Sequence, residues 1–168
     1  MSDNPDIEEA AGQLISHVPF ANAIGIRIIS AEKGKVTAKV PYADHLIGDP
    51  DSGIIHGGVI TAMLDNVCGS SVISALPAPM AIATIDLRID YMRPAEAGKD
   101  IFCTTECYRL TRAVAFVRGV AYTDSPDKPI AHCAGSFMLA ANRSDPIGAN
   151  TTASMIGEML AKNDGDAS

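Results

Sequence analysis

The spacing of apolar residues divides the chain into strands, one long helix and strands again. Between residues 56 and 76, apolar side chains fall on most sides of a helix instead of forming one stripe: Val59, Ile60, Met63, Leu64, Val67, Val72 and Ile73. A helix that is apolar on most sides is typical of a buried central helix. Gly57-Gly58 stands at its start, and Leu76-Pro77 ends it because proline cannot continue an α-helix.

After this helix the apolar period falls to two residues, which indicates strands. From Met80 to Met92, apolar residues alternate with polar ones. The apolar set is Ile85, Leu87, Ile89 and Tyr91, and the polar set is Thr84, Asp86, Arg88 and Asp90. This alternation predicts a half-buried antiparallel strand whose apolar set faces the core. Further strands are expected over about 100–110, 113–123 and 129–141, and their short connections make them neighbours.

Two strands are also expected before the helix, over about 25–32 and 35–41, with a turn at Lys33-Gly34. Asp6 can cap a first helix that ends near His17, and the stretch 43–55 is rich in turn formers and expected to be irregular. The tail is expected to hold a loop and a marginal helix over 154–162. The sequence thus predicts three parts: an N-terminal helix in 1–19, a main domain in 20–141 and a tail in 142–168.

Two strands, a buried helix and four strands leave few ways to cover the apolar surfaces. The economical one is a curved antiparallel sheet wrapped around the one long helix. The sequence therefore predicts an α+β protein with this arrangement, which is called the hotdog fold.

Composition and charge narrow the class of protein. A chain of 168 residues, 47% of them hydrophobic, can bury a core in one soluble domain. The net charge of −7 argues against a nucleic-acid surface, so any anionic ligand needs a local cationic patch. The acidic start has no apolar signal segment, which predicts a cytoplasmic protein. The scattered histidines show no metal-ligand spacing, and the cysteines show no CxxC pair and are expected to be reduced core residues: Cys68, Cys103, Cys107 and Cys133.

Asp65 is the residue that the apolar pattern does not explain. Its position in the central helix argues against a membrane span, because an Asp there opposes insertion by roughly 2.5–3.5 kcal/mol. A carboxylate among apolar residues is paired, protonated or functional, since an unpaired buried charge is costly. No basic residue lies within one turn of it on the helix, so a functional role is favoured over a structural ion pair.

Two strings in the sequence resemble a known family. They are Gly53-Ile-Ile-His56-Gly57-Gly58-Val-Ile-Thr-Ala-Met-Leu-Asp65 and Ala83-Thr84-Ile-Asp-Leu-Arg-Ile-Asp-Tyr91-Met-Arg-Pro94. Together they resemble the PaaI-like branch of the hotdog acyl-CoA thioesterases, in the 4-hydroxybenzoyl-CoA thioesterase superfamily. The resemblance implies that Asp65 acts across a dimer as base or nucleophile, that Gly57 donates to the thioester carbonyl, and that Thr84 places the water. It also implies a homodimer that assembles into a homotetramer.

The chemistry of thioester hydrolysis leads to the same two residues. The reaction needs donors for a developing oxyanion and either a nucleophile or a base for water. The N–H groups of Gly57 and Gly58 at the start of a helix favour negative charge, and Asp65 can act as the base. From Gly57 to Asp65 is eight residues, which is about 12 Å along one helix. A site that uses both residues therefore needs two chains, with antiparallel helices about a two-fold axis.

The remaining candidate residues have more open roles. His56 is expected to be structural or to contact the carbonyl. Asp49 stands in the loop where relatives often carry Asn, and its proximity to Asp65 would raise one of the two pKa values. The phosphates of CoA need cations, for which Arg88, Arg93 and above all Arg112 are candidates, with Lys99, Arg109 and Arg118 nearby in sequence. No cofactor is expected, because CoA is part of the substrate.

Other functions remain open at this level. A hotdog dehydratase or hydratase would pair His56 with Asp65, and a non-catalytic acyl-CoA-binding protein would keep the pocket and lose the base. For the thioesterase, attack by Asp65 itself through an anhydride is an alternative to an activated water. Aryl and short or medium aliphatic acyl groups both stay possible.

Overall fold

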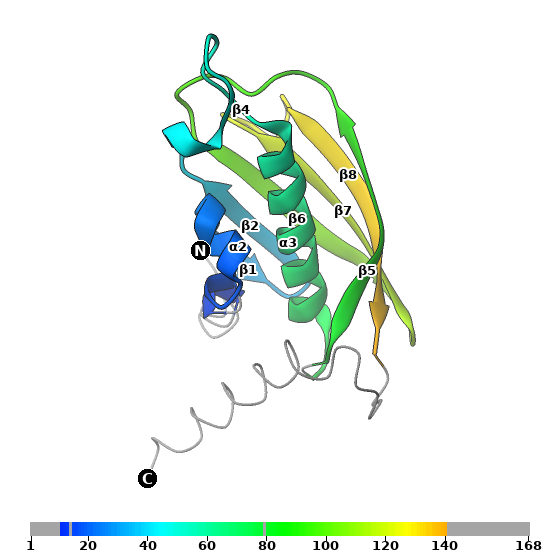
Figure 1. The fold of residues 1–168 in the computed structure, drawn as a ribbon. Helices are drawn as coiled ribbons and strands as arrows, with labels where there is room; N and C mark the ends of the chain where they lie inside the picture. The colour runs from blue at the N-terminus through cyan, green and yellow to red at the C-terminus, as the bar shows by residue number, and fades with distance from the viewer. Residues whose placement is uncertain (1–10, 14, 79, 141–168) are drawn as a thin grey trace.

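A computed structural model of the chain describes residues 11–13, 15–78 and 80–140, and its main feature is a curved sheet around one helix (Figure 1). The helix is α3 (Gly57–Ala75), and the antiparallel sheet has six strands in the order β1-β2-β6-β7-β8-β5. The strand bounds are β1 (Arg27–Glu32), β2 (Lys35–Val40), β5 (Ile82–Tyr91), β6 (Ile101–Leu110), β7 (Val114–Tyr122) and β8 (Ala131–Leu139). The predicted hotdog architecture is confirmed.

The smaller elements differ from the sequence prediction. The stretch 43–55 is not irregular throughout, since it contains the 3-10 helix η1 (Asp44–Leu46) and a hairpin of β3 (Ile47–Asp49) and β4 (Ile54–Ile55). The short helix α2 (Pro19–Ile24) was not predicted, because six residues are too few to show a helical period. The Asp6 cap and the tail helix over 154–162 lie outside the described residues.

Helix α3 is long and apolar enough to cross a membrane by length and composition, but it packs inside the sheet. Its side chains Met63, Leu64, Val67 and Val72 are fully buried, as are Val36 on β2, Ile101 on β6 and Val117 on β7. As predicted from its apolar pattern, α3 is the core helix of the domain. The side of α3 that carries Asp65 is only half-buried.

Strand β5 contains a bulge that the alternating pattern did not predict. Thr84 pairs with Phe137 of β8 and Asp86 with Ser136, so Ile85 is an extra residue between two paired ones. Ile85 is 57% exposed, and its predicted place on the buried face is therefore wrong. Because directly paired residues share a face, Thr84 joins the buried Phe137 on the helix side instead of the polar outer face. The bulge thus turns Thr84 toward α3.

Candidate active site

Asp65 lies in the middle of α3, half-buried, opposite the bulge of β5. Its Oδ1 accepts a hydrogen bond from the Thr84 hydroxyl at 2.9 Å. Among the described residues no Lys, Arg or His forms an ion pair with Asp65, and its Oδ2 has no hydrogen-bond partner. The carboxylate is therefore oriented by one hydroxyl and has one oxygen free to act on a ligand.

The start of α3 supplies one free backbone donor, where the sequence predicted two. The N–H of Gly58 donates to Nδ1 of His56 at 2.9 Å, so the prediction that Gly58 offers a free donor is wrong. The side chain of His56 caps the helix and takes this N–H. The N–H of Gly57 has no acceptor among the described residues, and it lies at the positive end of the helix dipole.

Tyr91 is a residue near the site that the sequence reasoning did not single out for a role. Its hydroxyl donates to the carbonyl oxygen of Gly57 at 2.6 Å and lies 2.8 Å from the hydroxyl of Thr61. The signal was present in the sequence, since Tyr91 belongs to the string that resembles the thioesterases and alternates onto the helix side of β5. The sequence did not reveal that the end of β5 contacts the start of α3.

Asp49 closes the turn of the β3–β4 hairpin, and hydrogen bonds within that turn hold its carboxylate. The hydroxyl of Ser52 and the backbone N–H of Asp51 donate to its carboxylate. These two hydrogen bonds hold the pKa of Asp49 below its ordinary value, and the rise expected for a close approach to Asp65 stays a prediction. The same hairpin packs on the helix start, because a Cβ at Gly48 would lie 2.8 Å from Cα of His56.

The cysteine closest to Asp65 along α3 is not a competing nucleophile. Cys68 is fully buried, and its sulfur lies 3.7 Å from that of Cys133 on β8. The hydrogen bond with Cys133, together with burial, raises the pKa of the Cys68 thiol well above its ordinary value. A thiol that stays protonated is a poor nucleophile. All four cysteines are free, and Cys68, Cys103 and Cys133 are buried as expected, whereas Cys107 is only half-buried.

The sequence that forms this site matches one protein family. Residues 52–130 match the family described as the thioesterase superfamily. The medium/long-chain acyl-CoA thioesterase YigI of Escherichia coli is 30% identical over 117 residues, which cover 62% of this chain and 75% of YigI. The chain belongs to the thioesterase superfamily. The matched residues 52–130 contain the helix start, Asp65 and all of β5.

Solved structures of two other proteins share this fold. A Pseudomonas aeruginosa protein of known crystal structure is 43% identical in sequence to this chain. The two structures match with a TM-score of 0.73 over 79% of this chain and 98% of that one. The PaaI protein of the phenylacetic acid degradation operon of Escherichia coli has a TM-score of 0.69 over 81% of this chain and 97% of that one. At 18% identity this second likeness concerns the fold alone. The expected hotdog fold and thioesterase family are thereby confirmed, and the PaaI-like branch within that family stays a prediction.

The cations predicted to bind CoA occupy different surroundings in this thioesterase fold. Arg88 lies on the outer face of β5 and pairs with Asp90 at 3.0 Å. Arg93 contacts Glu96 and the carbonyl oxygen of Lys128. Arg112 is exposed in the turn between β6 and β7, and its guanidinium has no partner in the described part of the chain. Their roles toward CoA stay predictions, and Arg112 is the cation of the three that no internal contact occupies.

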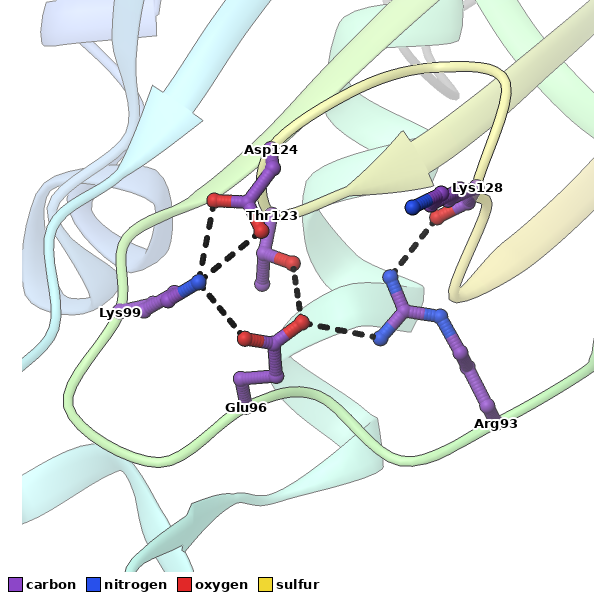
Figure 2. Close-up of polar contacts among 6 residues, drawn as sticks. All are labelled: Arg93, Glu96, Lys99, Thr123, Asp124 and Lys128. Carbon is purple, nitrogen blue, oxygen red and sulfur yellow. Dashed lines mark hydrogen bonds and ion pairs between the residues drawn. The ribbon is translucent and has the colours of Figure 1, made fainter.

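Arg93 belongs to a polar cluster that joins two loops (Figure 2). Glu96, in the connection from β5 to β6, contacts Lys99 at 2.7 Å and Arg93 at 3.4 Å, and Lys99 reaches Asp124 of the β7–β8 loop at 2.9 Å. The hydroxyl of Thr123 donates to Glu96 at 3.3 Å. The cluster ties the segment that follows Tyr91 to the neighbouring loop. Within the described residues no group of three or more His, Cys, Asp or Glu side chains is placed to hold a metal ion.

Glu96→Gln is expected to lower the melting temperature by about 1–3 °C at neutral pH. The hydrogen bond from Lys99 lowers the pKa of Glu96 from its ordinary value of 4.5, so its contribution to stability is present at higher pH and is lost as pH falls through the folded-state pKa. Thermal unfolding measured from neutral pH downward should show the melting temperatures of the wild type and Glu96→Gln converging as the pH falls below the ordinary Glu pKa of 4.5. Glu32→Gln is the control, since Glu32 makes no ion pair among the described residues. A difference that persists at low pH would contradict this account.

Proposed function

We propose that this protein hydrolyses acyl-CoA thioesters to a free acid and CoA. The observation that carries the proposal is Asp65, a carboxylate that has no counter-ion among the described residues and that Thr84 orients on the core helix of a thioesterase-superfamily fold. The similarity to YigI, which is named an acyl-CoA thioesterase, supports the substrate class. The reaction as proposed uses no cofactor, because CoA enters as part of the substrate.

In the proposed reaction, Asp65 takes a proton from a water molecule as the water oxygen attacks the thioester carbonyl carbon. The N–H of Gly57 donates to the oxyanion that forms, and the helix dipole favours this charge. Collapse of the intermediate breaks the C–S bond, and the proton held by Asp65 passes to the CoA sulfur. Direct attack by Asp65, with an anhydride that water then hydrolyses, gives the same products.

A site that contains both Gly57 and Asp65 requires two protomers in this proposal, because about 12 Å of helix separates the two residues. Strand β5 supports such a dimer, since β8 is its only neighbour in the described sheet and its other edge is open. Apolar side chains along and beside this edge are exposed: Ile85 at 57%, Tyr91 at 50% and Met92 at 61%. Pairing of β5 with β5 of a second copy would cover them and bring Asp65 near the edge of the partner. Assembly of two dimers into a tetramer is part of the same proposal.

The test of this function is release of free thiol from a panel of acyl-CoA thioesters. The panel contains short, medium and long aliphatic chains and aryl groups, with medium and long chains first because YigI is named for them. Turnover of at least one thioester, from a protein that elutes as a dimer or larger, is the expected result. Acyl-CoA binding without any thiol release would overturn the proposal in favour of a non-catalytic binding protein. Interconversion of enoyl-CoA and hydroxyacyl-CoA without thiol release would favour a dehydratase or hydratase.

A further inference from the structure

Tyr91, at the end of β5, is hydrogen-bonded to the first peptide group inside α3. Its hydroxyl donates to the carbonyl oxygen of Gly57 at 2.6 Å. The hydroxyl of Thr61, one turn further along α3, lies 2.8 Å from the Tyr91 hydroxyl and 3.3 Å from the same carbonyl oxygen. Two side-chain hydroxyls therefore meet at one carbonyl, although Tyr91 is 50% exposed and apolar packing does not demand either contact.

The opposite end of that peptide group is also engaged. The peptide that carries the Gly57 carbonyl carries the N–H of Gly58, and this N–H donates to Nδ1 of His56 at 2.9 Å. A nitrogen that accepts a hydrogen bond cannot carry the proton in a neutral imidazole, so the proton of His56 resides on Nε2. His56 is exposed, and its Nε2–H has no acceptor in the described residues. The side chain is thus presented as a hydrogen-bond donor and not as a base.

We propose that Tyr91 is a positioning residue that acts through the Gly57–Gly58 peptide and makes His56 a donor to the bound thioester. A hydroxyl that donates to the Gly57 carbonyl polarises the peptide, strengthens the Gly58 N–H as a donor and so stabilises the Nε2–H form of His56. In this proposal both the Nε2–H of His56 and the Gly57 N–H, which has no acceptor among the described residues, stabilise the negative charge that develops at the helix start. The kinetic part of this inference rests on the proposed thioesterase function, whereas the tautomer does not.

The tautomer of His56 is measured directly by nitrogen-15 NMR of the imidazole rings. The chain has four histidines, and loss of one set of signals in His56→Gln assigns His56. Two other rings calibrate the spectrum, because Nδ1 of His17 lies 2.7 Å from a carbonyl oxygen and Nε2 of His45 lies 3.2 Å from another. Since a carbonyl only accepts, His17 is expected as the Nδ1–H form and His45 as the Nε2–H form. We expect His56 to match His45, and a match to His17 would overturn the proposal whatever the activity.

Tyr91→Phe removes the hydroxyl and keeps the ring. We expect a mixture of His56 tautomers and a fall in kcat of about three- to tenfold with little change in KM. Tyr108→Phe is the matched control, because Tyr108 is 51% exposed on β6 and contacts Arg118 and Phe116 through its ring. We expect the control to keep the wild-type tautomer and kcat. A Tyr91→Phe protein that behaves like this control would overturn the proposal.

Thr61→Val provides a second variant if Tyr91→Phe does not fold. It removes the hydroxyl beside Tyr91 at an exposed helix position and should shift the tautomer and kcat in the same direction, by less. Absence of any shift in a folded Thr61→Val protein would count against the role of the hydroxyl pair. The two proposals also fail separately: a tautomer that responds to these variants, in a protein without turnover on any thioester, supports the positioning and overturns only the proposed reaction.

Discussion

Asp65→Asn is expected to lower kcat for acyl-CoA hydrolysis by about a hundredfold or more. The amide can neither accept the proton of the attacking water nor act as a nucleophile. Its carbonyl oxygen can still accept the hydrogen bond from Thr84, which the carboxylate accepts at 2.9 Å, so the orientation of the side chain is preserved. Because no cation pairs with Asp65 in the described structure, no ion is left uncompensated, and the melting temperature and oligomeric state should not change.

Thiol release under saturating substrate, with size-exclusion chromatography of the same samples, measures this effect. Asp44→Asn is the matched control, since Asp44 is exposed in η1 and its carboxylate has no partner among the described residues. The control should retain wild-type kcat. If Asp65→Asn keeps half of the wild-type kcat or more, the carboxylate is not the base or nucleophile. The proposed mechanism would then be wrong even if the protein hydrolyses thioesters.

Gly135→Ala is expected to destabilise the fold by about 1–3 kcal/mol and to reduce kcat as well. Gly135 of β8 pairs with Leu87, one residue pair beyond the bulge in β5. A Cβ at this position would lie 2.6 Å from the carbonyl oxygen of Asp86 and 3.0 Å from the Leu87 side chain. The obstacle is backbone and cannot rotate away, so β5 must shift. Such a shift displaces Thr84 from Asp65.

Urea unfolding measures the stability of this variant, and thiol release measures its kcat. Gly12→Ala is the matched control, because Gly12 lies in a helical segment and a Cβ there has no atom of the described residues within 4 Å. In a helix this exchange should leave stability unchanged or raise it. If Gly135→Ala is as stable as wild type with full kcat, the close approach of β5 and β8 does not determine the bulge or the position of Thr84.

The sequence alone was sufficient for the order of the elements and for the chemical identity of the main candidate residues. The apolar surface of residues 56–76 on most sides of a helix predicted a core helix, and α3 is one. Period-two patterns and short connections predicted the antiparallel neighbours β6, β7 and β8. These features are local: a helix or strand shows its buried face in the spacing of its own residues. Asp65 was also visible, because a charge inside an apolar helix contradicts that spacing.

Features that depend on contacts between distant segments were decided only by the tertiary structure. Thr84 faces Asp65 because one extra residue in β5 is accommodated opposite the step from Ser136 to Phe137 of β8. A strict alternation had placed Thr84 on the outer face. Arg93 contacts Glu96 of its own loop and also the carbonyl oxygen of Lys128, which comes from a second loop. At the helix start, Tyr91 from the end of β5 donates a hydrogen bond to the carbonyl oxygen of Gly57. Sequence spacing predicts which face a residue prefers, but bulges and long-range hydrogen bonds arise from pairing between segments, which spacing within one segment does not contain.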